Sequence, residues 1–117
     1  MSPLVTQPEV VAAHSLTPAT KLLTLRIPSD LCYFEGHFPG HPLLPGVVQV
    51  TWAAQFGREY FDLPKQFTRL SLVKFMRVIA PESRVTLTLE YKEARKELAF
   101  AYRCGEALCS SGNIGFT

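Results

Sequence analysis

Two histidines stand in a short stretch that is rich in proline and glycine, FEGHFPGHPLLPG at residues 34–46. The imidazole of histidine titrates close to neutral pH, so it can accept or donate a proton under physiological conditions. His37 lies between the flexible Gly36 and the restrictive Pro39, and neighbouring glycines allow a substrate to approach the backbone closely. This stretch predicts a general acid-base site centred on His37, with His41 as a second titratable group.

A second candidate for chemistry is the start of the segment that follows this stretch. Pro45 occupies a position typical of the first residue of a helix, and residues 47–61 contain no proline, so we expect a helix over that range. The first amides of a helix, here near Gly46, Val47 and Val48, lack partners within the helix and carry partial positive charge. A carbonyl oxygen or an oxyanion is therefore expected to bind there.

The predicted helix is apolar on two broad stripes. Helical spacing places Val47, Val50, Ala54 and Phe61 on one stripe, and Val48, Trp52, Phe56 and Tyr60 on the other. A helix of this kind is expected to be buried on most sides, as it would be if a sheet wrapped around it.

The remaining segments predict strands. Alternation of apolar and polar residues, which is clearest over residues 85–91, is typical of half-buried strands, and short breaks between the runs predict antiparallel hairpins. Residues 31–45 contain too many prolines and glycines for a long regular element, so an ordered loop or a short helical turn is expected there. The predicted strands are residues 9–15, 21–27, 67–79, 83–92, 98–104 and 107–116.

Composition predicts one globular domain over residues 1–117, with 47% hydrophobic and 19% charged residues. A chain of this size gains stability from a partner subunit, so a dimer is expected. The net charge of +2 without charge runs argues against nucleic-acid binding. Three cysteines without a paired motif, no secretion signal and no long apolar run predict a reduced, cytoplasmic protein without a membrane span or a metal site.

The stretch GHFPGHPLLPGVV, followed by AAQFG, resembles the active-site signature of the hotdog-fold 3-hydroxyacyl-acyl carrier protein dehydratases of fatty-acid synthesis. Further along, LVKFMRVIAPESRVTLTLEY is similar to the strand-turn-strand that follows the helix in that family, so the resemblance covers about residues 31–91. The longer form GHFPGHPLLPGVVQ is most similar to dehydratase-like members encoded with aryl-polyene pathways. The resemblance implies an α+β hotdog fold, in which a curved antiparallel sheet wraps around one long central helix.

The resemblance also implies roles for individual residues. His37 would remove the proton from C2 of a 3-hydroxyacyl thioester, and the backbone at Gly46 and Val47 would polarise the thioester carbonyl. In the family, an acidic residue on the central helix of the partner subunit helps to expel the hydroxyl group. The substrate would be carried on the phosphopantetheine of an acyl carrier protein, with no metal or redox cofactor. Further residues expected to contact the substrate are Phe38, Pro39, His41 and Gln55.

The acidic position is where this chain departs from the family pattern, because Thr51 occupies it. A threonine is too weak an acid to replace a carboxylic acid. As a catalytic candidate, Thr51 would use its hydroxyl to orient a water molecule or to hydrogen-bond the departing hydroxyl group; alternatively, it packs or bonds to the carbonyl one turn earlier in the helix. Three explanations stay open at this stage. Gln49 or Gln55 orients a water molecule, Glu35 or His41 supplies the proton, or the chemistry is weaker or different.

Two classes of function therefore remain. The first is a lyase that forms trans-2-enoyl thioesters in fatty-acid-like or aryl-polyene biosynthesis, as a homodimer with sites at the subunit interface. The second is a non-catalytic, thioester-binding subunit that assembles with another hotdog protein, while an acyl thioesterase is a weaker third option. Basic residues that would meet an acidic carrier protein, unless they are simply solvated, are Arg58, Arg69, Lys74, Arg77 and Arg84; expected core or strand residues are Trp52, Phe56 and His14.

Overall fold

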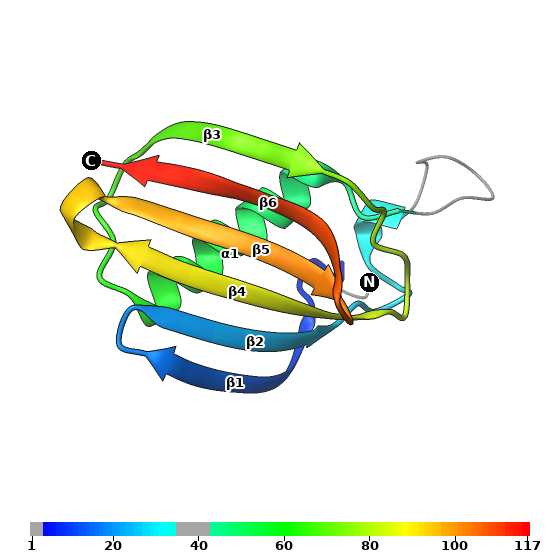
Figure 1. Ribbon diagram of the computed structural model, residues 1–117. Coiled ribbons are helices and arrows are strands. Elements are labelled where there is room, and N and C mark those ends of the chain that lie inside the picture. Colours follow the sequence, from blue (N-terminus) through cyan, green and yellow to red (C-terminus); the bar gives the residue numbers. More distant parts are fainter. Residues whose placement is uncertain (1–3, 35–42) are drawn as a thin grey trace.

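The computed structural model describes residues 4–34 and 43–117, and in these residues one α-helix packs against one six-stranded sheet (Figure 1). The helix is α1 (Gly46–Tyr60). The strands are β1 (Glu9–Thr17), β2 (Thr20–Arg26), β3 (Phe67–Phe75), β4 (Arg84–Lys92), β5 (Glu97–Cys104) and β6 (Ala107–Phe116). Two short 3₁₀ turns, Cys32–Phe34 and Glu93–Arg95, complete the described elements.

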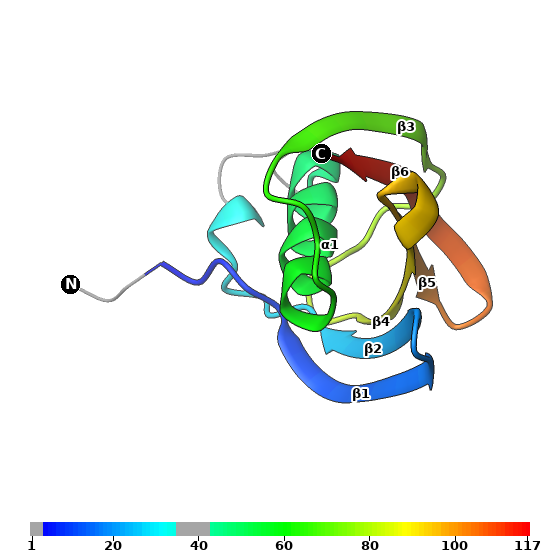
Figure 2. The ribbon, with the colours of Figure 1, turned by 90° about the vertical axis from the view of Figure 1, so that its left-hand side faces the viewer.

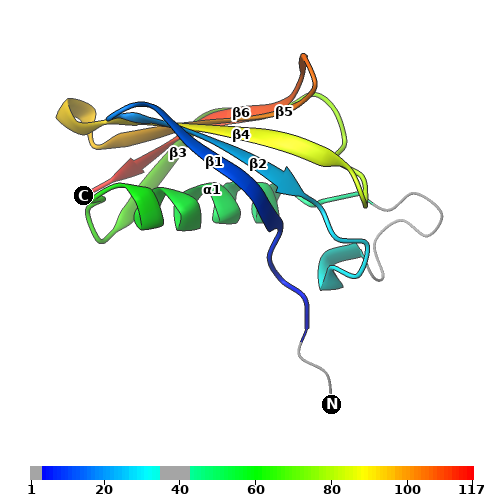
Figure 3. The same cartoon turned by 90° about the horizontal axis from the view of Figure 1, so that it is seen from below.

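All neighbouring strands of the sheet are antiparallel, in the order β1-β2-β4-β5-β6-β3. The sheet curves around α1, which lies along its concave side (Figures 2 and 3). The chain leaves the sheet after β2, forms α1, and returns at the far edge as β3, so β3 pairs with β6 rather than with β2. This is the predicted hotdog arrangement.

The core lies between the helix and the concave face of the sheet. The alternation predicted for β4 is confirmed, since Val85, Leu87 and Leu89 are almost fully buried while Glu90 is exposed. Trp52 and Phe56 of α1 are buried against these strands, as expected. At Gly57 the helix comes so close to β5 that a Cβ atom would lie 2.5 Å from a methyl group of Leu98, which explains a glycine in the middle of a helical segment.

The helix is less enclosed than its sequence predicts. The stripe that contains Val48, Trp52 and Phe56 is buried, but Val47 is 73% exposed and Val50 and Ala54 are only partly buried. A sheet covers one side of a helix, and within the described residues nothing covers the opposite side near its start. The prediction of burial on most sides is therefore wrong for this chain taken alone.

Strand β3 also differs from its predicted extent of residues 67–79, because it ends at Phe75. The amides of Met76 and Arg77 both donate to the carbonyl of Cys109, at 2.8 and 3.1 Å, which breaks the regular ladder of the sheet. Leu72 adopts a left-handed backbone with φ of 55°, next to an irregularity in the pairing with β6. No residue pattern within 67–79 predicts a bulge of this kind.

The hairpin of β1 and β2 is confirmed, and His14 is an exposed residue of β1, as expected. The N-terminal segment crosses the helix side of the molecule: Val5 forms an isolated bridge with Leu31, and the indole Nε1 of Trp52 donates to the carbonyl of Thr6 at 3.0 Å. Among the described residues, no helix is both long enough and apolar enough to cross a membrane.

Candidate active site

The predicted site residues fall into two groups. Gly46, Val47, Thr51 and Gln55 lie in α1 and can be placed, and all four line the same pocket. The other predicted residues lie outside the described residues, and they are His37, Phe38, Pro39, His41 and the candidate proton donor Glu35.

Among the described residues, no side chain caps the start of the helix. Pro45 is the N-cap residue, with φ of −60° and ψ of 146°, rather than the first helical residue, and no acidic side chain lies in the first turn. The carbonyl of Pro45 accepts from the amides of Val48 and Gln49, at 3.1 and 3.2 Å. Val48, which was expected to have an unpaired amide, is therefore satisfied. Within the described part of the chain, the amides of Gly46 and Val47 remain without such a partner. The partial positive charge at the start of the helix is therefore located on these two N–H groups.

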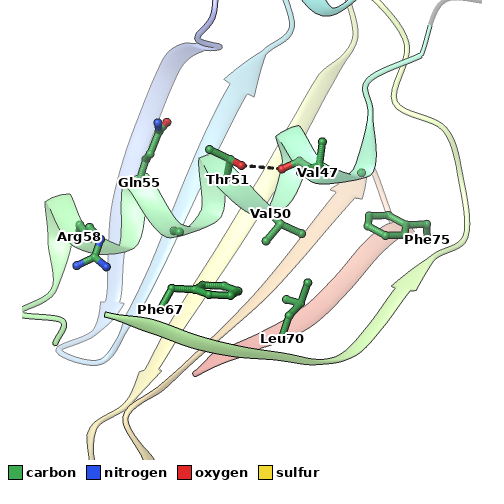
Figure 4. A pocket seen from close by; sticks show the side chains of 10 residues that line it. Val47, Val50, Thr51, Gln55, Arg58, Phe67, Leu70 and Phe75 are labelled. Carbon is green, nitrogen blue, oxygen red and sulfur yellow. Dashed lines mark hydrogen bonds between the residues drawn. The ribbon is translucent and has the colours of Figure 1, made fainter. Parts of the chain in front are cut away.

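A pocket of about 540 Å³ lies between this helix and β3, and we call it the α1–β3 groove (Figure 4). Val50 points from the helix toward Phe67, Leu70 and Phe75 of β3, and these side chains make the groove predominantly apolar. On the helix, Thr51 and Gln55 project from the edge that faces away from β3 (Figure 4). The groove therefore offers an apolar surface beside polar helix positions, which suits an acyl chain attached to a polar head.

The ring of Phe75 lies directly on Gly46. A Cβ atom at position 46 would lie 2.6 Å from the tip of the Phe75 ring, so glycine is the residue that allows this contact. A second, smaller hollow of about 320 Å³ lies beside the first, and Gly46 and Phe75 line both of them. The helix start is thus the point at which the two hollows meet.

The hydroxyl of Thr51 donates to the carbonyl of Val47 at 2.8 Å, in the backward bond that is common for threonine in helices. The donated proton is thereby engaged within the helix. The oxygen keeps lone pairs with which it can accept a hydrogen bond, and the side chain is exposed at the groove. Thr51 is placed to accept a hydrogen bond but not to act as an acid.

Gln49 does not orient water in the groove, contrary to one of the explanations offered for the missing acid. It is only 3% exposed, and both ends of its side-chain amide are already bonded. Its Nε2 donates to the carbonyl of Leu44 at 3.1 Å, and its Oε1 accepts from the hydroxyl of Ser110 at 2.6 Å. No sequence pattern predicts this arrangement, because Ser110 lies 61 residues away.

Two of the five basic residues have structural partners. Arg58 donates to the carbonyls of Pro64 and Lys65, at 3.0 and 2.9 Å, and Arg69 pairs with the nearly buried Glu97 at 3.0 Å. Arg58 also lines the α1–β3 groove, and Arg77 lines the smaller hollow next to Gly46, so these two of the five are placed at the hollows of the site.

Two titratable groups of β5, Tyr102 and Cys104, are held in their neutral forms. Burial raises the pKa of Tyr102, whose hydroxyl donates to the backbone carbonyl of Gln49 at 2.7 Å. Burial, followed by the neighbouring Cys109, raises the pKa of the Cys104 thiol to about 11, so a thiolate nucleophile is not favoured there. Among the described residues, no group of three His, Cys, Asp or Glu side chains is arranged to hold a metal ion.

Comparison with known proteins identifies the family. Residues 13–113 match the family model described as ApeI-like, ApeI dehydratase. The solved structure of the dehydratase heterocomplex ApeI:P from Xenorhabdus doucetiae has a TM-score of 0.87 to this chain at 27% identity, and covers 93% of this chain and 96% of its own. An uncharacterized protein from Erwinia carotovora subsp. atroseptica has a TM-score of 0.82 at 31% identity, covering 95% and 96%.

Curated relatives include 3-hydroxyacyl-[acyl-carrier-protein] dehydratases named FabZ. The protein of Oenococcus oeni is 30% identical over 90 residues, which are 68% of this chain and 65% of that protein. The protein of Syntrophotalea carbinolica is 32% identical over 74 residues, or 56% and 50%. The match thus spans between half and about two thirds of the length of these relatives. On the family match and the full-length structural similarity together, this chain belongs to the ApeI-like dehydratase family and has the hotdog fold.

Proposed function

We propose that this chain takes part in the dehydration of 3-hydroxyacyl thioesters to trans-2-enoyl thioesters, with the acyl group carried on the phosphopantetheine of an acyl carrier protein in fatty-acid-like or aryl-polyene biosynthesis. The observation that carries this proposal is the start of α1, where Gly46 and Val47 line the apolar α1–β3 groove and their amides have no partner among the described residues. Membership of the ApeI-like family supports the same reaction class.

In the proposed reaction, the thioester carbonyl oxygen accepts hydrogen bonds from the amides of Gly46 and Val47. These bonds stabilise the negative charge that develops on the oxygen as the C2 proton leaves. His37 is the proposed base that takes this proton. The electron pair left at C2 forms the C2–C3 double bond, the C3–O bond breaks, and the hydroxyl group departs as water once it has received a proton.

The source of that last proton distinguishes two versions of the proposal. In the first, the chain is complete in itself, and Glu35 or His41 supplies a proton to the hydroxyl group. In the second, a different hotdog subunit that carries Glu or Asp at the position equivalent to Thr51 supplies it. The engaged hydroxyl proton of Thr51 favours the second version.

The same observation supports a second candidate function, in which the chain is a non-catalytic partner. A subunit whose helix carries threonine in place of the expected acid at position 51 contributes an incomplete half to a site that is shared between subunits. The chain would then bind a thioester, or only support its partner, without turning substrate over itself. A thioesterase remains the least favoured option, because the helix position that such hotdog enzymes usually fill with an acid is Thr51 here.

The first prediction tests these functions directly. The purified protein is incubated with 3-hydroxyacyl thioesters of several chain lengths on a carrier protein, and enoyl product and free carrier thiol are followed by mass spectrometry. We expect enoyl product that is lost in His37→Ala, because the base that removes the C2 proton is then absent. His14→Ala is the matched control, since His14 lies exposed on β1, and its turnover should equal that of the unmodified protein.

Each alternative has its own result in this experiment. Product that forms only after a second dehydratase-like subunit is added would support the partner function. Free thiol without enoyl product would indicate a thioesterase. Unchanged turnover in His37→Ala would remove His37 as the base.

A further inference from the structure

A buried cluster of polar side chains lies under the first turn of α1, and the proposed chemistry does not use it. Gln49, Ser110 and Tyr102 are all almost fully excluded from solvent, on α1, β6 and β5 respectively. Ser110 donates to the side chain of Gln49 at 2.6 Å, and Tyr102 donates to the backbone carbonyl of Gln49 at 2.7 Å. Burying polar groups in an apolar core is costly unless each is bonded, so such a cluster is held in one geometry.

The cluster is connected to the helix start through Leu44. The Nε2 of Gln49 donates to the Leu44 carbonyl at 3.1 Å, while the Leu44 amide donates to the carbonyl of Ile79 at 2.8 Å. Both backbone groups of Leu44 are therefore fixed, and its side chain is buried. The next two residues are Pro45, whose φ is restricted by its ring, and Gly46. Fixing Leu44 therefore restricts the direction in which the Gly46 amide points.

We infer that Gln49, braced by Ser110, is a positioning residue that holds the Leu44 carbonyl and thereby aims the Gly46 amide at the thioester carbonyl. The inference rests on the proposed function for its effect on turnover, but the restriction of Gly46 is a property of the free protein. An oxyanion site depends on donors that are already in place when charge develops, and a displacement of about 1 Å can lower the rate about 100-fold.

The test compares Gln49→Met with the unmodified protein. Methionine keeps nearly the same length and fills the same space, but it cannot donate to Leu44 or accept from Ser110. We expect kcat for dehydration, measured with the partner subunit if one is needed, to fall between about 10-fold and 100-fold, with a smaller change in KM. In ¹⁵N relaxation measurements, the order parameter of the Gly46 amide should fall from about 0.85 toward about 0.6.

Two further variants separate positioning from general destabilisation. Leu89→Val, in the core of β4 and distant in sequence from the cluster, should lower the melting temperature while leaving kcat and the order parameter of Gly46 unchanged. Adding Ser110→Ala to Gln49→Met removes the hydroxyl that the first change leaves without a partner. The double variant should recover part of the decrease in melting temperature but none of the lost kcat, because the Leu44 carbonyl still lacks its hydrogen bond from residue 49.

The outcomes distinguish this inference from the proposed function. A Gly46 amide that stays rigid in Gln49→Met overturns the inference, whether or not the protein turns substrate over. A mobile Gly46 amide with unchanged kcat would show that the cluster is not relevant to catalysis. The same conclusion would follow if kcat and the melting temperature both recovered in the double variant. A mobile Gly46 in a protein that, even with a partner subunit, forms no enoyl product supports the positioning and rejects the proposed function instead.

Discussion

At the scale of single residues, the main question is what Thr51 means for catalysis. It stands where the family's acid is expected, it lines the rim of the α1–β3 groove on the helix edge that faces away from β3, and its hydroxyl is bonded to the carbonyl of Val47. The exposed position has room for a longer side chain, and the groove gives that side chain access to a bound acyl group. The position thus lacks the acid that the family pattern predicts but keeps access to the groove.

This leads to a second prediction, for Thr51→Glu. A carboxylic acid at the groove should raise kcat for dehydration by about 10-fold or more, because general acid catalysis typically contributes about 10²- to 10⁴-fold. Steady-state assays with the substrates used for the His37 variants measure the effect. Thr51→Val, which removes the hydroxyl but keeps the branched shape, is the matched control and should bring no gain. Equal or lower turnover in Thr51→Glu would mean that this position does not reach the leaving hydroxyl group.

At the scale of elements, the contact between α1 and β5 determines how closely the helix lies on the sheet. Gly57 permits the approach, since a Cβ atom there would lie 2.5 Å from one methyl group of Leu98 and 3.2 Å from one of Leu63. Leu98 is fully buried, so its side chain has little space into which it can move. The same helix carries Gly46 and Thr51, so its position on the sheet determines the position of the α1–β3 groove.

The third prediction concerns this contact. Gly57→Ala should destabilise the protein by about 1–3 kcal/mol, because overpacking outweighs the higher helix propensity of alanine. Urea unfolding measures the change. Adding Leu98→Val, which shortens the side chain that the new methyl group would contact, should recover part of the lost stability. Stabilisation by Gly57→Ala would instead show that Leu98 moves aside at little cost.

At the scale of the whole molecule, one edge of the structure is unusually apolar. Phe67, Leu70, Leu72 and Phe75 of β3 are all between 42% and 74% exposed, and Val47 of α1 is exposed beside them. Large exposed apolar surfaces commonly mark interaction sites, and an edge strand can also pair with another chain. A second hotdog subunit, of the same or of a different kind, is the proposed occupant of this edge, and it would cover the open side of the helix.

The fourth prediction tests that assembly. Leu70→Asp should weaken association at least about 10-fold, because it places a charge in an apolar contact. Sedimentation velocity over a range of concentrations, for the protein alone and mixed with a second hotdog subunit, gives the dissociation constants. Leu16→Asp, at a 58% exposed leucine on the opposite edge strand β1, is the control and should associate normally. Equal weakening by both changes would argue against the β3 edge as the interface.

The sequence alone was sufficient for the local features of this protein. Breaks at proline and glycine, the period of two in β4 and the apolar run of α1 each depend on residues near one another in the chain, so the six strands and the helix were predictable from local pattern. The hotdog fold was predicted from the resemblance to the dehydratase family. The roles of His37, Phe38, Pro39 and His41 remain predictions, because those residues lie outside the described part of the structure.

Only the tertiary structure decided which distant residues meet. It placed β3 beside β6, left Val47 exposed, and bonded Gln49 to Ser110 across 61 residues. The physical reason is that burial and hydrogen bonding depend on neighbours in space. The sequence around a helical glutamine is no different when its side chain faces solvent than when it bonds to a serine in the core. Gln49, which the sequence offered as a candidate for orienting water, is therefore proposed instead to hold the start of the helix.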